Sequence, residues 1–530
     1  MWPQNYVPLG SLPLSTLAAA APIAVLLVLL GILRKPAWMA SLAGLATAAI
    51  VAAAVYGMPG SLLASSVLYG AAFGIFPIGW VVFTAILLYR VTVESGHFEV
   101  LKDSIAGLTT DRSLQALLIA FAFGAFVEGA AGFGTPVAVA GAMLAGLGFS
   151  PFYAAAICLL ANTAPVAFGS IAIPITTLAA VTNLPLDRLS AGVGRICAPV
   201  SLFIPSYLTA VMSGWTGLRA IWPATAVCGI AFAGTQFFVS NFVGPQLTDI
   251  LASLAAMGSL VILIRLWKPE TAAPSHKHST REVIRAWAPY ALLVVFILAW
   301  GHPQIQPYLK GADKLIQWPG LHNAIQRVPP VVNKPAAYAA VFNFSWLSAS
   351  GTACFLAAIL SSFVVGLSPV RFLRVIGQTA RQLALAELTL AAVLGLAFLL
   401  NYSGATATLG LAFAATGVAF PFFSALLGWV GVFLTGSDTS ANALFGTLQV
   451  VTAHQLGMNP VLMASANSSG GVMGKMISLT SIAVAAAATH MKREDESLLF
   501  RFTLRHSIFL ASVVGLIALF YAYVMPSWAP

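Results

Sequence analysis

The chain has 530 residues, a length that would suit about three or four soluble domains. Only 8% of its residues are charged and 59% are apolar, whereas soluble domains carry roughly 25% charged residues. The net charge of +10 comes from basic residues that stand singly or in small groups between apolar runs, as in the loops of membrane proteins. We therefore expect an all-α polytopic membrane protein in a lipid bilayer, with no nucleic-acid partner.

Apolar runs follow one another along the whole chain, and several are too short to cross a bilayer core of about 30 Å alone. The short runs flank glycine-rich polar motifs, so they are interpreted as half-helices or re-entrant hairpins. With each pair of short runs counted as one segment, the whole chain has about 12–14 membrane segments. In chain order the runs lie near residues 14–33, 37–56, 67–89, 114–127, 137–149, 152–161, 170–181, 196–212, 221–239, 247–266, 287–301, 337–366, 382–400, 405–420, 422–435, 443–453, 476–489 and 506–525.

Basic clusters predict the orientation in the membrane. If these clusters lie in the cytoplasm, both termini are periplasmic. The proline-rich connection 302–336 carries four basic residues of its own and opposes this assignment. No basic residue precedes Arg34, so the first span is expected to be retained and not cleaved as a signal peptide. The clusters are Arg34 and Lys35; Arg265, Lys268, Lys277, Arg281 and Arg285; and Lys492, Arg493, Arg501 and Arg505.

Two pairs of similar segments indicate an internal repeat. Residues 124–129 (GAFVEG) match 431–436 (GVFLTG) at an offset of 307, and 161–169 match 466–474 through Ala-Asn-Thr/Ser and a later glycine at an offset of 305. Each match is weak alone, but both occur in the same order at nearly the same offset. The predicted organisation has three parts. The first repeat covers residues 1–224, connecting helices with a basic cytoplasmic loop cover 225–306, and the second repeat covers 307–530.

The first motif with functional chemistry is Glu128-Gly-Ala-Ala-Gly-Phe-Gly134-Thr-Pro136. Its three glycines and its proline interrupt a helix, and broken backbone at membrane depth must be buried in protein or line a cavity. Close helix packing would explain Gly129 and Gly132. It would not explain a carboxylate, which costs about 2.5–3.5 kcal/mol at the centre of the bilayer. We therefore interpret the motif as functional.

Three further motifs place polar residues between apolar runs. The segment 162–170 contains Asn162 and Thr163 around a proline; it is either part of a site or a capped, kinked helix. Segments 435–442 and 467–475 concentrate hydroxyls, amides, one acid and one base, and a surface loop is the alternative for both. The clearest intramembrane base is Lys475, and an ionisable group inside the membrane is a functional hypothesis by default.

Long strings of this sequence resemble the L-lactate permease family of bacterial proton-coupled 2-hydroxy-monocarboxylate transporters, which includes glycolate permeases. The resemblance runs nearly end to end. The strings are Trp2-Pro-Gln-Asn-Tyr6, Phe126-Val-Glu-Gly-Ala-Ala-Gly-Phe-Gly134, Asn162-Thr-Ala-Pro-Val-Ala-Phe-Gly169, Asn401-Tyr-Ser-Gly404, Gly428-Trp-Val-Gly-Val-Phe-Leu-Thr-Gly-Ser-Asp-Thr-Ser440, Gly470-Gly-Val-Met-Gly-Lys-Met-Ile-Ser478 and Phe500-Arg-Phe-Thr.

This resemblance implies proton-coupled uptake of L-lactate, and also of D-lactate and glycolate, across the bacterial inner membrane. It further implies two structural repeats, inverted or parallel, with re-entrant hairpins and an elevator-like carrier. Glu128 or Asp438 is expected to carry the proton, since burial can raise the pKa of a carboxyl group by 3–5 units. The expected substrate-binding residues are Gly129, Gly132, Gly134, Asn162, Thr163, Arg195, Tyr402, Ser403, Ser437, Thr439, Asn442, Asn467, Ser468, Ser469 and Lys475.

The sequence leaves three alternatives to a proton-coupled transporter. Sodium in place of the proton could bind among asparagine side chains and unwound carbonyls. An intramembrane enzyme would need a catalytic set, and the sequence offers no His-Asp pair, metal spacing or nucleotide motif, so neither a cofactor nor a metal is expected. A channel would differ by giving a flux that neither saturates nor runs uphill.

Overall fold

The computed structural model describes residues 1–132, 134–267 and 278–529. Eleven helices are long and apolar enough to cross a membrane, or up to twelve if a bent pair, Pro151–Ala161 with Val166–Thr182, is counted as one span. Some apolar runs that look separate in the sequence are joined: 405–420 and 422–435 lie in one candidate span, Ala405–Thr435. The expected polytopic helical architecture is confirmed. Lys268 and Lys277 of the expected basic loop, and Phe133 of the first motif, lie outside the described residues.

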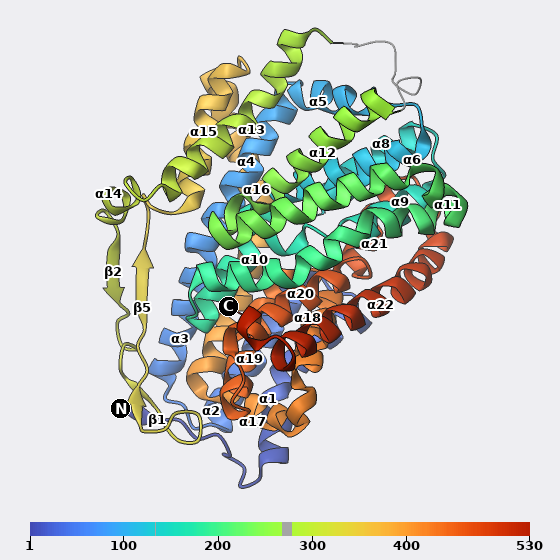
Figure 1. Ribbon diagram of the computed structural model, residues 1–530. Coiled ribbons are helices and arrows are strands. Elements are labelled where there is room, and N and C mark those ends of the chain that lie inside the picture. The colour runs from blue at the N-terminus through green and yellow to red at the C-terminus, as the bar shows by residue number, and fades with distance from the viewer. Residues whose placement is uncertain (133, 268–277, 530) are drawn as a thin grey trace.

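The chain is helical along most of its length (Figure 1). In the first half, the α-helices are α1 (Leu12–Leu27), α2 (Ala37–Ala54), α3 (Gly60–Phe73), α4 (Trp80–Glu94), α5 (His97–Ala106), α6 (Arg112–Ala116), α7 (Gly124–Ala130), α8 (Thr135–Gly146), α9 (Pro151–Ala161), α10 (Gly169–Thr182), α11 (Leu186–Phe242) and α12 (Thr248–Trp267). In the second half they are α13 (Thr280–Gly301), α14 (Gln306–Lys310), α15 (Ser350–Val364), α16 (Pro369–Ser403), α17 (Ala405–Phe413), α18 (Phe420–Thr435), α19 (Asp438–Gln455), α20 (Pro460–Lys475), α21 (Leu479–Ala488) and α22 (Glu496–Tyr523). The π- and 3₁₀-helical segments are η1 (Val28–Ile32), η2 (Gly74–Gly79), η3 (Leu117–Phe123), η4 (Val166–Phe168), η5 (Pro245–Leu247), η7 (Ala414–Ala419), η8 (Arg493–Asp495) and η9 (Pro526–Trp528).

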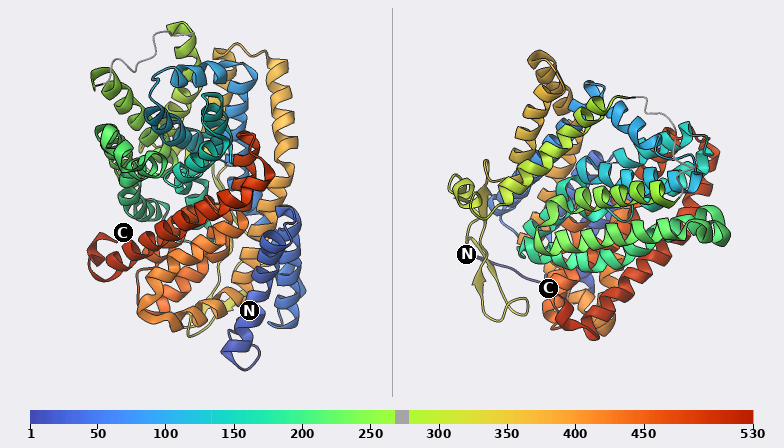
Figure 2. Two further views of the ribbon diagram at one scale, coloured as in Figure 1. Left: turned by 90° about the vertical axis from the view of Figure 1, so that its right-hand side faces the viewer. Right: turned by 45° about the horizontal axis from the view of Figure 1, so that its top comes forward.

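The helices form two groups that lie side by side (Figure 2, left). In the first group, α16 packs against α2, α3 and α4, and α15 packs against α4 and α13. The second group combines α7 to α12 with α18 to α22. Segments about 300 residues apart in sequence therefore share one helical group, and both pairs of repeat motifs fall inside it.

The same order of elements occurs twice in the second group. In α7 to α11, two helices separated by a glycine break are followed by a tight turn, then by two helices separated by a second break, and finally by a long helix. Helices α18 to α22 follow the same order. The contacts between the two series are reciprocal: α10 packs against α19 as α21 packs against α8, and α11 packs against α20 as α22 packs against α9. The boundary expected at residue 224 falls inside α11, which has non-helical backbone at Gly214 and Ile221.

Local sequence explains where the helices of the two series begin. Gly134 and Gly436 have φ values of +81° and +74°, a left-handed conformation that glycine adopts without steric cost and that breaks each helix. After the tight turns, α9 and α20 begin in the same way. In each, a capping side chain, Ser150 or Asn459, accepts hydrogen bonds from the first turn, and a proline occupies the first helical position.

The 302–336 connection lacks a membrane span, as expected, but it contains strands that the sequence did not predict, and a further strand at 341–344 lies in the apolar run expected at 337–366. β2 (Lys314–Gln317) pairs antiparallel with β5 (Val341–Phe344); β3 (Ile325–Arg327) lies between β1 (Trp2–Pro3) and β4 (Ala336–Ala337). The N-terminal segment is anchored further by Gln4, whose Nε2 donates to the carbonyls of Asn401 and Tyr402 at 2.9 Å each. These strands lie along one flank of the molecule, next to the N-terminus (Figure 1).

Candidate functional site

A cavity of about 260 Å³ lies where the helix breaks of the second group face α16 and α2 of the first group. This size suits a small ligand, because cavities for drug-sized molecules are about 300–1,000 Å³. Its polar wall comes from both series of helices and its apolar wall from α2 and α16. The lining residues are Ala37, Glu128, Gly134, Val166, Gly169, Ser170, Ile173, Pro174, Ala386, Thr389, Leu390, Thr435, Gly436, Ser437, Asp438, Thr439, Ser440, Lys475, Thr480, Ser481 and Val484.

Four helices begin at this cavity: α8, α10, α19 and α21. The first backbone N–H groups of a helix lack partners inside the helix, and the helix dipole places partial positive charge at that end. Gly134 stands at the start of α8, and Ser437 caps α19 by accepting a hydrogen bond from the Ser440 N–H at 3.3 Å. The convergence of four such ends, two from each series, makes the cavity suited to an anion.

Backbone strain accompanies the start of α10. Ser170, Ile171 and Ala172 all have positive φ values, of 48°, 57° and 60°. Such values are unfavourable for a β-branched residue like Ile171 and cluster at functional sites in proteins. The Ser170 hydroxyl donates to the carbonyl of Ala131 at 2.8 Å and so ties this segment to the break after α7.

Two carboxyl groups and one ammonium group face the cavity. Glu128 comes from α7 and is 4% exposed; Asp438 is the first residue of α19 and is 3% exposed. Lys475, at the end of α20, interacts electrostatically with both and donates to the carbonyl of Gly436 at 2.6 Å. Glu128 Oε2 and Asp438 Oδ1 have no hydrogen-bond donor within the described residues. The site therefore has acceptor atoms that can take a proton.

A network of buried amides and hydroxyls supports Asp438 from behind. Ser468 donates to Asp438 Oδ2 at 2.7 Å, and Asn442 Nδ2 lies 3.2 Å from the same oxygen. Asn467 donates to Asn442 Oδ1 at 3.0 Å, and Gln449 donates to Asn467 Oδ1 at 3.0 Å. The carboxyl group of Asp438 is thus fixed by side chains of both α19 and α20.

The structure brings most of the expected site residues together, in the cavity wall or directly behind it. Gly129 faces α12, and Gly132 has a φ value of +62° and packs against Ser170. Neither polar atom of the buried Asn162 side chain has a hydrogen-bond partner within the described residues, whereas the Thr163 hydroxyl donates to the Leu160 carbonyl at 2.7 Å. The residues in the wall are Glu128, Gly134, Ser437, Asp438, Thr439 and Lys475; those behind it are Gly129, Gly132, Asn162, Thr163, Asn442, Asn467, Ser468 and Ser469.

Three expected residues lie away from the cavity. The Arg195 guanidinium donates to Asn241 at 2.8 Å and to the Trp528 carbonyl, and it stacks over the Trp528 ring. The Tyr402 hydroxyl donates to the Ala339 carbonyl at 3.0 Å, and Ser403 donates to its own helix. Tyr402 holds the end of α16 against the connection between β4 and β5.

Sequence reasoning did not select several residues of the wall. Thr480 and Ser481 open α21 after the cap Ser478, whose hydroxyl accepts from the Ser481 N–H at 3.2 Å. In the sequence, two serines three residues apart, Ser478 and Ser481, indicate this helix start. Thr389 of α16 gave no signal, because nothing in the sequence shows that α16 faces the breaks.

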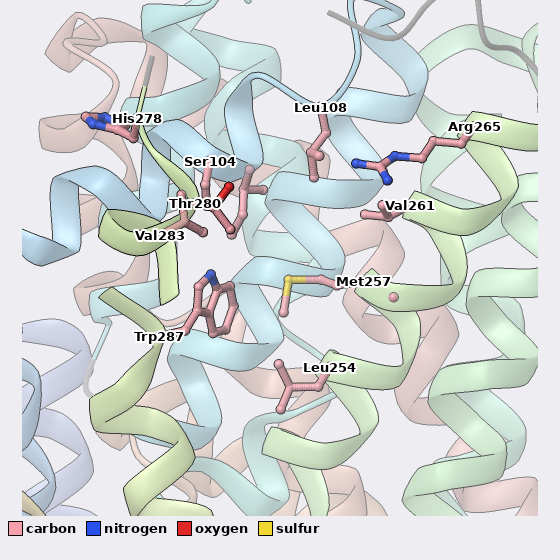
Figure 3. A pocket seen from close by; sticks show the side chains of 12 residues that line it. Ser104, Leu108, Leu254, Met257, Val261, Arg265, His278, Thr280, Val283 and Trp287 are labelled. Carbon is pink, nitrogen blue, oxygen red and sulfur yellow. The ribbon is translucent and has the colours of Figure 1, made fainter. Parts of the chain in front are cut away.

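A second cavity, of about 590 Å³, lies between α5, α12 and α13 (Figure 3). Leu254, Met257 and Trp287 face it, while Arg265 and His278 stand near its rim. His278 is within 3.2 Å of the carboxylate of Asp103. This cavity is mostly apolar and contains none of the motif residues.

Comparison with known proteins gives the family. The L-lactate permease family profile matches residues 15–525, nearly the whole chain. The chain belongs to the L-lactate permease family. It is 44% identical to the glycolate permease GlcA of Escherichia coli (strain K12), over 99% of this chain and 98% of that protein. It is also 44% identical to the L-lactate permease of Bacillus subtilis (strain 168), over 99% of both, and 41% identical to the L-lactate permease of E. coli (strain K12), over 100% of both.

Membership of this permease family indicates a transporter and not an enzyme. Two solved structures are distantly similar in fold: the Neisseria gonorrhoeae efflux pump MtrF (15% identity, TM-score 0.46, 88% of this chain and 84% of that chain) and the Alcanivorax borkumensis transporter YdaH (15%, 0.47, 86% and 87%). The seven family strings noted in the sequence occupy three places in the fold. Four lie at the breaks around the cavity, those at residues 2–6 and 401–404 pack against each other, and the string at residues 500–503 lies in α22.

Proposed function

We propose that this protein is a secondary active transporter that couples uptake of L-lactate, and of D-lactate and glycolate, to proton entry across the bacterial inner membrane. The observation that carries the proposal is the cavity in which four helix N-termini, one lysine and two carboxyl groups converge. The lactate and glycolate permeases among its relatives favour a 2-hydroxy-monocarboxylate as the substrate.

The substrate carboxylate binds at the helix N-termini, where backbone N–H groups and Lys475 supply positive charge. The 2-hydroxyl group binds the hydroxyl-rich start of α19, where Ser437, Thr439 and Ser440 line the wall. The apolar wall from α16 accommodates the methyl group of lactate and excludes water. Glycolate lacks this methyl group and uses the same polar contacts.

Charge balance couples the proton to the substrate. With Glu128 and Asp438 ionised and Lys475 protonated, the three groups carry −2 + 1 = −1. A lactate anion brings the total to −2 in a buried site, where the repulsion between like charges is weakly screened. One proton on either carboxyl group restores −1. The anion and the proton therefore bind more favourably together than separately, which is the thermodynamic requirement for symport.

The position of the cavity between two helix groups supports an elevator-like mechanism. The charged residues and most of the polar residues of the site belong to the second group. Helices α16 and α2 of the first group contribute side chains that cover the opposite side of the cavity. The reciprocal contacts of α7 to α11 with α18 to α22 are those of two units related by a two-fold axis. We place α7 to α10 and the first part of α11 in the first repeat, 1–224, and α18 to α22 in the second, 307–530, with both termini in the periplasm. The start of α13 and the N-terminus lie at opposite ends of the molecule (Figure 1).

Counterflow in proteoliposomes tests this function. Vesicles loaded with unlabelled L-lactate should take up labelled L-lactate, and external D-lactate and glycolate should compete, in buffer without sodium. Dependence on sodium would favour the sodium-coupled alternative. A flux that does not saturate, or failure of both competitors, would contradict a 2-hydroxy-monocarboxylate carrier.

A further inference from the structure

A third buried acid, Asp249, lies behind the substrate cavity. It stands in the first turn of α12, which follows the short segment η5. The side chain is 1% exposed, and neither carboxyl oxygen has a hydrogen-bond donor within the described residues. Its sequence context does not single it out, because an acid at the start of an apolar run also suits a helix end at the membrane surface.

Two ordinary roles do not fit this geometry. A capping aspartate at the start of a helix accepts hydrogen bonds from the first backbone N–H groups. Asp249 accepts none within the described residues. An ion pair would need a cation, and the only charged group that acts on Asp249 in the described part of the chain is another acid, Glu128. An ionised carboxylate that is buried without donors or a cation is far less stable than the neutral acid. Asp249 therefore carries a proton in this conformation.

Close packing places Asp249 next to the proton-coupling segment. A Cβ atom on Gly129 would lie 2.9 Å from the Cβ of Asp249, so only glycine allows this approach of α7 to α12. Gly129 directly follows Glu128, which faces the cavity. Two titratable groups on neighbouring helices interact electrostatically with Asp249: Glu128 on α7 and the Cys197 thiol on α11. The other elements that pack against α12, η3 and η5, contain no titratable residue.

We propose that Asp249 is the internal proton acceptor of the transport cycle: it is ionised before the transfer, receives the coupled proton from Glu128, and holds that proton behind the cavity in the conformation described here. The O–H bond of the Glu128 carboxyl group breaks and an O–H bond forms on Asp249. Glu128 becomes a carboxylate that interacts with Lys475, and Asp249 becomes neutral. The total charge of the interacting groups is the same whichever carboxyl group holds the proton. This inference rests on the proposed proton symport.

The test compares Asp249→Asn with the wild-type protein in proteoliposomes. The amide has nearly the shape of the protonated acid and cannot exchange a proton. Wild-type vesicles should accumulate lactate about tenfold per unit of pH difference, acid outside. The Asn variant should keep counterflow but fall to equal concentrations on both sides. Its counterflow should also lose the pH dependence of the wild type. Asp187→Asn is the matched control: this exposed aspartate lies in the first turn of α11, and its variant should accumulate normally.

The outcomes separate this inference from the function on which it rests. If wild-type vesicles do not accumulate lactate from a pH gradient, proton symport fails, whatever Asp249 does. If the wild type accumulates and Asp249→Asn accumulates equally, the role of Asp249 is overturned and symport stands. If the Asn variant loses counterflow as well, Asp249→Glu decides: restored accumulation supports an acid requirement, and loss of both activities makes Asp249 a packing residue.

Discussion

Replacement of Lys475 tests whether its ammonium group binds the substrate carboxylate. The group lies in the cavity wall and donates one hydrogen bond, to the Gly436 carbonyl at 2.6 Å, which leaves two further N–H donors. A hydrogen bond to a charged partner contributes about 1.5–3 kcal/mol. At about 1.4 kcal/mol per tenfold change, Lys475→Gln should weaken lactate binding about ten- to a hundredfold. Lys475→Arg keeps the charge and should lose less.

The assay is the half-saturation concentration for lactate in counterflow, where no gradient is needed. The neutral analogue lactamide, used as a competitor, should discriminate less between wild type and Lys475→Gln, because it lacks the carboxylate. Lys492→Gln, at an exposed lysine between α21 and α22, is the matched control and should leave half-saturation unchanged. Equal half-saturation for lactate in wild type and Lys475→Gln would refute the reasoning and make Lys475 a structural partner of Glu128 and Asp438.

Three further changes have definite expected outcomes. Glu128→Gln should retain counterflow but lose pH-driven accumulation; an undiminished accumulation ratio would move the coupling role to Asp438. Gly470→Ala would place a methyl group on the Ala425 carbonyl of α18, and such overpacking costs about 1–3 kcal/mol, so its thermal transition in detergent should fall while that of Gly258→Ala, in open space, should not. Arg195→Gln should leave the half-saturation for lactate unchanged, because its guanidinium is occupied by Asn241 and Trp528; a tenfold increase would place Arg195 in the substrate path.

Local chemistry makes the helix breaks predictable. Glycine, proline and polar residues inside apolar runs are unfavourable in lipid, so Gly134 and Gly436 stand out in the amino-acid sequence alone. The same logic selects Glu128, Asp438 and Lys475, and all three face one cavity. The polar residues of a site in a membrane protein can therefore be recognised where they interrupt a hydrophobic pattern.

Long-range packing cannot be predicted in the same way. Arg195 looks like a binding residue because it begins an apolar run, but its partner Trp528 is more than 300 residues away in sequence. Tyr402 lies in a family string, yet it packs on the connection before α15. Asp249 could not be predicted, because it is buried where α12 packs against Gly129 of α7. This contact between helices leaves no pattern in the local sequence.

The central claim is that one lactate anion enters with one proton, and the driving force tests it most directly. This pair carries no net charge, so the membrane potential, worth about 2.3 kcal/mol per charge per 100 mV, should contribute nothing. Each unit of pH difference should contribute about 1.4 kcal/mol, a tenfold accumulation. In proteoliposomes with the voltage clamped, an acid-outside gradient should drive lactate uptake, and voltage at equal pH should not. Strong accumulation from a negative-inside potential at equal pH would contradict the account, because it requires at least one additional cation per lactate.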